Sequence, residues 1–240
     1  MVLAKRLRLA VAGLTDVGRR REHNQDNTTH VVPTDETTLE EKGALFVVCD
    51  GMGGHATGEV AAEMGVKTIP EAYYASKEPN IISALASAIK KANQAIFGYA
   101  LEHTESTGMG TTCVTLLVHG GRGYFVNIGD SRGYIVRDGK MRQVTQDHSW
   151  VGEQVRLGLL TEEQARTHAH RNVITRSLGT QPTVNADLFV ETLQDGDRVL
   201  LCSDGLHGYV EESAVERVML QEDDPDLFVP GFDQDGVTLA

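Results

Sequence analysis

The sequence contains no apolar run long enough to cross a membrane. A membrane-spanning helix needs about 18 or more consecutive apolar residues, and no run in this 240-residue chain approaches that length. The N-terminal stretch MVLAKRLRLAVAGLTD is first basic and then briefly apolar, but no small-residue cleavage site follows it. We therefore expect no membrane span, no signal peptide and a cytoplasmic location, and we interpret the apolar piece LRLAVAGL, residues 7–14, as a strand.

Positive charge is scarce. The chain has 22 Lys and Arg residues against 34 Asp and Glu, which gives a formal net charge of -12 at pH 7. Nucleic acids and anionic lipid surfaces both attract basic faces. Neither is therefore expected as a partner of this protein.

Cysteine is also scarce, and the three that are present do not form a recognisable motif. Cys49, Cys113 and Cys202 each lie inside an apolar run, and none has a second cysteine at CxxC spacing. Reactive thiolates require electropositive, partly exposed surroundings. The three are therefore predicted to be buried, inert thiols of a reducing compartment.

Strand-like apolar runs are plentiful, and no repeat or low-complexity segment interrupts them, which predicts one mixed α and β domain over residues 1–240. Asp138-Gly139 separates two of these runs as a two-residue hairpin turn, so at least part of the sheet is antiparallel. The runs beyond residue 14 are ALFVVCD, TTCVTLLVH, GYFVNIG, GYIVR and DRVLLCSD.

Three helices are predicted from capping residues and apolar spacing. Thr57 can cap a helix that runs to about Ala75, and Asn80 can cap another whose apolar residues recur at helical spacing as far as Ala100. Thr161 and Gln164 have the spacing of a capping box, which begins a shorter helix. This third helix lies in a polar segment, residues 145–178, which we interpret as an excursion from the sheet.

Three strand-like runs end in aspartates. Asp50 and Asp204 are each followed by glycine, and Asp130 is preceded by one. Any one of them is explained by turn chemistry. Several carboxylates converging from neighbouring strands repel one another unless a cation lies between them, so the three together favour a metal site. Oxygen ligands without His–Cys spacing favour Mg²⁺ or Mn²⁺ over zinc.

The glycines that follow Asp50 raise the alternative of a phosphate-binding loop. The stretch GMGGHATGE contains no lysine, so it does not match a nucleotide P-loop, and it lacks the spacing of a dinucleotide fingerprint. Its glycines more plausibly allow close approach of the backbone, so that the carbonyl of Gly51 can itself reach a metal.

Six stretches, taken together and in this order, resemble the metal-dependent serine/threonine protein phosphatases of type 2C in their bacterial form. They are TDVGRRREHNQD, VVCDGMGGHATGEVAA, GMGTT, NIGDSRGYIVRDGKMRQVTQDHS, RNVITRSLG and LLCSDGL, within roughly residues 8–215. The resemblance implies an α+β fold, a four-layer α-β-β-α sandwich of two antiparallel sheets flanked by helices, with two metal ions at one edge. It also implies that residues 145–178 form a flap that shapes substrate access.

The resemblance also implies roles for individual residues. Asp50 bridges two Mn²⁺ or Mg²⁺ ions, and the Gly51 carbonyl and Asp204 help to bind them. Asp26 supports the waters of the metals, and Asp130 binds a third, weaker metal. The implied reaction is direct attack of a metal-activated water on phosphoserine or phosphothreonine.

The expected partners follow from that reaction. Arg21 matches the arginine that binds the substrate phosphate. The substrates would be phosphorylated proteins made by serine/threonine kinases, and the enzyme is expected to be a monomer. The general acid is left open: some relatives have a histidine where this chain has Met52, and His55 or a bound water could take that part.

The C-terminal part, about residues 216–240, departs from the family pattern. Asp235-Gly236 stands where an Asp-Asn pair normally opens a last strand, and the stretch before it has the acidic and proline content of a loop. We expect Asp235 to complete the metal site by a shortened path. If it does not, the second metal loses an anionic ligand and activity should fall sharply. The altered tail motivates a second hypothesis, a non-catalytic phosphoprotein-binding regulatory module with an incomplete metal site, and a metal-dependent hydrolase of small phosphate esters or nucleotides is a third.

Overall fold

The computed structural model describes residues 9–18, 23–53, 57–221 and 224–225. In these ranges the strands are β1 (Asp26–Val31), β2 (Ala44–Met52), β3 (Gly110–Thr111), β4 (Cys113–His119), β5 (Arg122–Ile128), β6 (Arg132–Arg137), β7 (Lys140–Gln143), β8 (Asp187–Thr192) and β9 (Arg198–Cys202). The helices are α1 (Glu36–Lys42), α2 (Thr57–Tyr74), α3 (Ile81–Glu102), α4 (Trp150–Arg156), α5 (Glu162–Thr167), α6 (Asp204–His207) and α7 (Glu212–Gln221), with a 3-10 turn at Thr104–Ser106.

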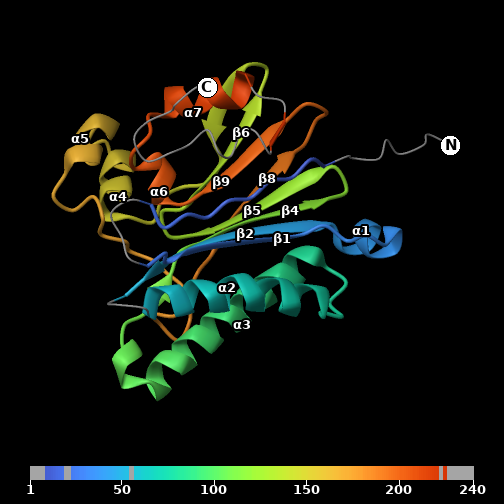
Figure 1. The fold of residues 1–240 in the computed structure, drawn as a ribbon, viewed down its shortest axis with the longest axis horizontal. Coiled ribbons are helices and arrows are strands. Elements are labelled where there is room, and N and C mark those ends of the chain that lie inside the picture. Colours follow the sequence, from blue (N-terminus) through green and yellow to red (C-terminus); the bar gives the residue numbers. More distant parts are fainter. Residues whose placement is uncertain (1–8, 19–22, 54–56, 222–223, 226–240) are drawn as a thin grey trace.

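The strands form two antiparallel sheets. The larger has the order β1-β2-β4-β5-β8, with the short β3 paired to β2, and the smaller has the order β7-β6-β9. Figure 1 shows α2 and α3 along one face of the larger sheet, with the smaller sheet and α7 on its other side. The predicted class, two antiparallel sheets flanked by helices, is confirmed.

Three apolar clusters hold these layers together. One joins the larger sheet to α2 and α3 and includes Leu45, Leu117 and Ile96. A second fills the space between the sheets around Phe125 and Ile135, and a third packs α7 against the smaller sheet. Burial of apolar area on both faces of the larger sheet makes it the rigid centre of the molecule.

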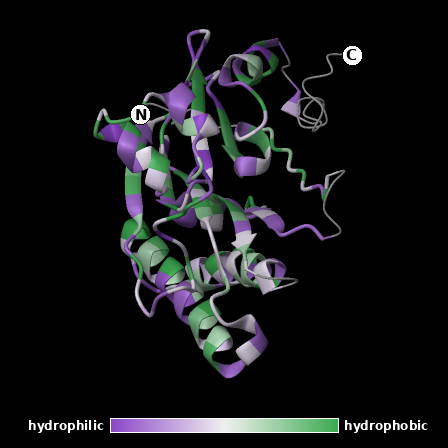
Figure 2. Cartoon of the chain, turned by 90° about the vertical axis from the view of Figure 1, so that its left-hand side faces the viewer, coloured by the Kyte–Doolittle hydropathy of each residue, from purple (hydrophilic) through white to green (hydrophobic). Residues whose placement is uncertain are grey.

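The long helices form where the sequence predicts them. The Asn80 side chain accepts a hydrogen bond from the Ser83 N–H at 3.0 Å, which caps α3. Leu85, Ile89 and Ile96 from its apolar face are buried. In Figure 2, α2 and α3 carry both hydrophilic and hydrophobic residues around their circumference, as expected for helices that bury one face. No helix in the described ranges has the length and apolar character of a membrane span.

The strand predicted at residues 7–14 is wrong for its described part. Residues 9–14 belong to no strand, and the first strand is instead β1, which begins at Asp26. Side chains tie this segment to β1: the Thr15 hydroxyl donates to the Asp26 carbonyl at 3.1 Å, and Asn24 Nδ2 donates to Thr15 Oγ1 at 2.7 Å. Apolar composition alone does not form a strand without a ladder of backbone partners.

The hairpin and the excursion both follow the prediction. Asp138 and Gly139 have φ values of 53° and 75°, which suit the tight turn between β6 and β7. Residues 145–178 leave the sheets and contain α4 and α5, and the capping box of Thr161 and Gln164 is present at the start of α5. We call residues 145–178 the flap segment. Its two ends meet at a β-bridge between Ser149 and Ile174.

Candidate active site at the carboxylate edge

Two aspartates face each other across the first two strands. The antiparallel register pairs Asp26, the first residue of β1, with Asp50 near the end of β2. Paired residues of this kind lie about 4.5–5.5 Å apart between their Cα atoms. The fold therefore places two carboxylates side by side although 24 positions (50 − 26) separate them in the chain.

Two more aspartates reach the same place. Asp130 follows β5, and Asp204 opens α6 directly after β9. Burial raises the pKa of Asp50 to about 10, and the negative charges of Asp26 and Asp204 add to this increase. Asp130 contributes as well, and its own pKa is raised to about 7 by burial and by the charge of Asp204. We call Asp26, Asp50, Asp130 and Asp204 the carboxylate edge.

The backbone of Asp50 is held by the neighbouring GMGTT segment. Its N–H donates to Thr112 Oγ1 at 3.0 Å, and its carbonyl accepts from the Thr112 N–H at 2.8 Å and from Thr111 Oγ1 at 2.9 Å. Asp26, which lies opposite Asp50 on β1, accepts a hydrogen bond at Oδ2 from Ser203 Oγ at 2.6 Å; Ser203 follows β9. These partners fix the carboxylates before any ligand arrives. Thr111, Thr112 and Ser203 are not predicted as site residues from the sequence, although they lie in the matched stretches GMGTT and LLCSDGL.

Gly51 permits the start of α2 to pack directly on the site. A Cβ at Gly51 would lie 2.0 Å from the Gly58 carbonyl oxygen, which no side chain can occupy. The Gly51 N–H donates to the Gln25 carbonyl at 2.9 Å. The close approach expected from the glycine-rich stretch is therefore present. The role of the Gly51 carbonyl as a metal ligand stays a prediction.

Two partly buried residues, Arg132 and His207, join the segments around this edge. Arg132 forms hydrogen bonds through Nε and Nη2 to Asp147 and through Nη1 to Glu212, joining β6 to the flap segment and to α7. His207 Nε2 lies 3.0 Å from the Asp130 carbonyl, and burial lowers the pKa of His207 to about 4. A neutral His207 therefore donates to that carbonyl.

The donor set fits hard divalent cations. Within the described ranges, no group of three or more His, Cys, Asp or Glu side chains is arranged so that it could hold a metal ion as it stands. The register nevertheless pairs Asp26 with Asp50, and the negative charges of Asp26, Asp204 and Asp130 all raise the pKa of Asp50, as expected for carboxylates that lie close together. An open, oxygen-rich edge whose anions repel one another is what a cation would stabilise.

Three residues named in the sequence analysis lie outside the described residues. They are Arg21, His55 and Asp235. The phosphate-binding role of Arg21 and the ligand role of Asp235 stay predictions, as does the involvement of His55 in proton transfer.

The cysteines behave as inert core residues. Cys49, Cys113 and Cys202 are free and buried, and burial raises the pKa of Cys202 to about 12. For Cys49, a hydrogen bond with Cys113 and burial raise the pKa well above the usual thiol range. Protonated, buried thiols are poor nucleophiles, so none of the three is a candidate for covalent catalysis.

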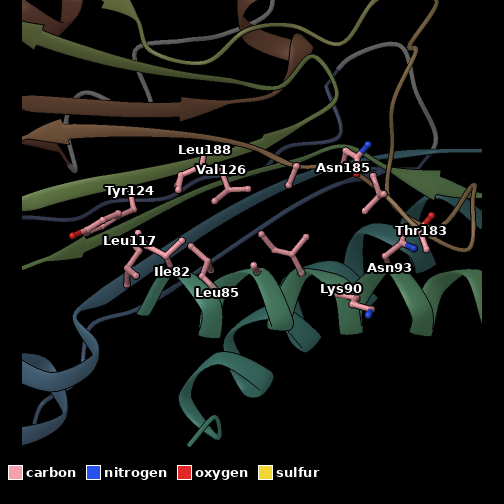
Figure 3. Close-up of a pocket in the computed structure, with 14 residues that line it drawn as sticks. Ile82, Leu85, Lys90, Asn93, Leu117, Tyr124, Val126, Thr183, Asn185 and Leu188 are labelled. Atoms are coloured by element: carbon pink, nitrogen blue, oxygen red, sulfur yellow. The ribbon is translucent and has the colours of Figure 1, made fainter. Parts of the chain in front are cut away.

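A groove of about 610 Å³ lies away from the carboxylate edge, between α3 and strands β4, β5 and β8 (Figure 3). Leu85, Leu117, Val126 and Leu188 line its apolar part, and Lys90 lies toward its polar end. It shares no lining residue with the carboxylate edge. We therefore place the candidate active site at the carboxylate edge and not in this groove.

Comparisons with known proteins define the class. The family model for protein phosphatase 2C matches residues 17–231, and the chain belongs to this family. The serine/threonine phosphatase stp of Listeria innocua is 38% identical over 209 residues, covering 85% of this chain and 81% of the relative. The predicted resemblance to bacterial type 2C phosphatases is confirmed.

Solved structures agree at the level of the fold. The serine/threonine phosphatase Stp1 from Staphylococcus aureus superposes with a TM-score of 0.79 at 33% identity, covering 95% of this chain and 92% of that structure. The catalytic domain of the serine threonine protein phosphatase PstP, in complex with two manganese ions, superposes with a TM-score of 0.76 at 32% identity, covering 90% and 88%. The prediction of an enzyme of the serine/threonine phosphatase class is confirmed by these relatives.

Proposed function

We propose that the chain removes phosphate from phosphoserine and phosphothreonine residues of proteins in a reaction that depends on divalent metal ions. The observation that carries this proposal is the carboxylate edge, where four aspartates from four separate segments come together. Membership of the protein phosphatase 2C family supports the same reaction. The relatives are named as phosphatases, so the comparisons give no support to the non-catalytic alternative.

The metal ions in this proposal are Mn²⁺ or Mg²⁺, two bound at the centre of the edge and a third bound more weakly. Asp50 would hold the first two together with Asp204 and the Gly51 carbonyl, and Asp26 would orient waters bound to them. Asp130 would hold the third, and Asp235 is proposed as a further ligand. Such ions, when bound, supply an acidified water and neutralise the charge of the phosphate oxygens.

The residues of the chain mainly hold the metal ligands and the substrate phosphate in position. Thr111 and Thr112 hold the backbone of Asp50, and Ser203 holds one oxygen of Asp26, so the carboxylates need little rearrangement to bind cations. Arg21 is proposed to bind two oxygens of the substrate phosphate, because a guanidinium group matches phosphate in a bidentate geometry. Phosphoproteins made by serine/threonine kinases are the proposed substrates.

The test is metal-dependent hydrolysis of a phosphothreonine peptide by the chelator-treated protein, with Mn²⁺ or Mg²⁺ added back. We expect activity only with metal, and we expect Asp50→Asn to lower kcat/KM by more than about 100-fold, since even residues outside the ligand shell of a metal site cost 10- to 100-fold. Full activity in excess chelator would refute the metal-dependent reaction.

Asp138→Asn is the matched control. Asp138 is also an aspartate, but it occupies the exposed hairpin turn at φ 53°, a conformation that asparagine tolerates as well. We expect this variant to keep wild-type activity and metal dependence. A comparable loss in both variants would mean that the effect of Asp50→Asn is not specific to the carboxylate edge.

A further inference from the structure

The segment that carries Asp130 is held by a histidine that the proposed reaction does not use. Gly129 and His148 exchange two hydrogen bonds: the His148 N–H donates to the Gly129 carbonyl at 2.8 Å, and the Gly129 N–H donates to His148 Nδ1 at 3.1 Å. The His148 side chain is buried, with 3% of its surface exposed. Both backbone groups of the residue before Asp130 are therefore bonded to one buried residue.

The geometry fixes the tautomer of this ring. A backbone N–H can only donate, so His148 Nδ1 accepts and carries no proton. The proton is then on Nε2, which donates to Asp187 Oδ2 at 3.1 Å. Arg176 Nη1 lies 3.1 Å from the same Nε2, but its two N–H groups donate to Asp187 Oδ1 at 2.7 Å and to the Asn185 carbonyl at 3.1 Å. Asp187 and Arg176 together orient a neutral imidazole toward Gly129.

Gly129 needs such an external partner. Its φ of 106° lies in the region that glycine alone adopts readily, and a Cβ there would lie 2.7 Å from the Thr112 side chain. A glycine at such a position gains no rigidity from a side chain of its own. Its backbone is fixed by its hydrogen-bond partners. These are His148 and the side chain of Asn127, whose Nδ2 donates to the Gly129 carbonyl at 3.1 Å.

The same histidine joins the carboxylate edge to the flap segment. The His148 carbonyl accepts from the Thr175 N–H at 2.8 Å, and the adjacent Ser149 forms a β-bridge with Ile174. His148 therefore bonds through its ring to the residue before Asp130 and through its carbonyl to the far end of the flap segment. On the other side of Asp130, His207 bonds to the Asp130 carbonyl at 3.0 Å.

We propose that His148 is a positioning residue: its Nδ1 fixes the Gly129 backbone, and thereby places the Asp130 carboxylate for the weaker metal and couples that placement to the flap segment. The proposal rests on the proposed function, because it assumes that Asp130 is a metal ligand. It assigns His148 no contact with substrate and no proton transfer.

Two substitutions separate the two nitrogens of the ring. His148→Asn keeps an acceptor near the position of Nδ1, whereas His148→Gln keeps a donor near the position of Nε2. We expect the Asn variant to bind Mn²⁺ nearly as wild type does. We expect the Gln variant to lose about 10- to 100-fold in affinity at the weaker site, the usual cost of removing a residue that orients a metal ligand.

The measurements are calorimetric titration with Mn²⁺ alone and amide hydrogen exchange at Gly129 in the metal-free protein. Exchange at Gly129 should be faster in His148→Gln than in His148→Asn. Neither readout requires turnover, so failure of the proposed phosphatase reaction would be distinguished from failure of this proposal. Equal Mn²⁺ affinity and equal exchange in both variants, or a greater loss in Asn than in Gln, would overturn it.

Two further variants guard against a purely structural effect. His119→Asn is the matched control, because the His119 ring also bonds a backbone group, the Glu40 carbonyl at 2.9 Å, but at the opposite end of the β4–β5 hairpin from Asp130. It should leave Mn²⁺ affinity unchanged. Asp187→Ala removes the acceptor of Nε2 from a half-exposed position, so we expect this variant to fold even if the His148 variants do not. It should weaken Mn²⁺ binding and speed exchange at Gly129, and unchanged values would contradict the proposal.

Discussion

The carboxylate edge and the apolar cluster between the larger sheet and α2 and α3 differ in what the removal of side chains from water does to stability. In the apolar cluster, side chains such as Leu117 and Ile96 are completely buried among other apolar groups, which stabilises the fold. At the carboxylate edge, the partly buried Asp50 and the buried Asp130 have pKa values raised to about 10 and about 7, which means that their charged forms cost free energy there. The first region stabilises a geometry that the second region would not adopt alone.

This difference explains why polar side chains surround the carboxylate edge in such density. Thr112 bonds both backbone groups of Asp50, and its hydroxyl also lies 2.7 Å from Ser131 Oγ. Mutually repelling carboxylates would separate if their backbone were free to move. A rigid sheet and bonded neighbours keep them close, which is the condition for binding cations tightly.

The largest expected effect is that of a substitution at Asp50 of the carboxylate edge, which should change activity and stability in opposite directions. Asp50→Asn should abolish hydrolysis but make the metal-free protein more stable at pH 7. The pKa of Asp50 in the folded state, about 10, lies above its ordinary value of about 4. Between these two values the free energy of unfolding therefore falls as the pH rises, because ionised Asp50 is less stable in the folded state. Below the lower value the carboxyl group is protonated in both states, and this destabilisation vanishes. Urea unfolding in chelator at pH 8 and pH 5 tests this, and a destabilised variant at pH 8 would contradict it.

The second effect lies in the apolar cluster and should leave catalysis intact. Leu117→Ala removes a fully buried side chain from β4 and should lower the free energy of unfolding by about 2–5 kcal/mol. The folded fraction should keep its kcat and metal affinity, because Leu117 does not touch the carboxylate edge. Denaturant unfolding and peptide hydrolysis measure the two effects. Leu101→Ala, at a position 70% exposed, is the control that should change stability little.

Gly51 connects the two regions, because it follows Asp50 and packs against Gly58 at the start of α2. A Cβ in Gly51→Ala would meet the Gly58 carbonyl, so the start of α2 must move, at a cost of about 1–3 kcal/mol, and the metal edge must move with it. We expect thermal unfolding and hydrolysis both to be impaired. Gly98→Ala in α3 is the control: no atom lies within 4 Å of the added Cβ, and the variant should be slightly stabilised. Equal behaviour of the two variants would argue against close packing at Gly51.

The smallest effect tests a helix cap remote from the site. Asn80→Ala removes the side chain that accepts from the Ser83 N–H, and it should lower stability by about 1 kcal/mol. Asn80→Asp should restore most of that stability, since aspartate caps helices equally well. Thermal unfolding measures both variants. A change in metal affinity in either variant would show that α3 is coupled to the carboxylate edge, which the comparison does not predict.

Much of the site could be predicted from the sequence because its aspartates follow apolar runs. Asp50, Asp130 and Asp204 were located in this way, and the order of the matched stretches indicated the family. The strand predicted at residues 7–14 is wrong for its described part, residues 9–14, because apolar composition does not reveal whether a partner strand is present. Strands β1 and β8 were not foreseen, and β8 begins at Asp187, the partner of His148. The roles of Arg21 and Asp235 stay predictions.

The sequence by itself determined the local features: the Asn80 cap, the Asp138-Gly139 turn, the capping box of Thr161 and the strand-end aspartates. Each depends on interactions between residues a few positions apart, so a short stretch contains the necessary information. Only the tertiary structure decided that Asp26 pairs with Asp50 and that the pKa of Asp50 is raised. It also decided which nitrogen of His148 carries the proton. These properties arise where distant segments meet, because register, burial and charge depend on all the neighbours in space.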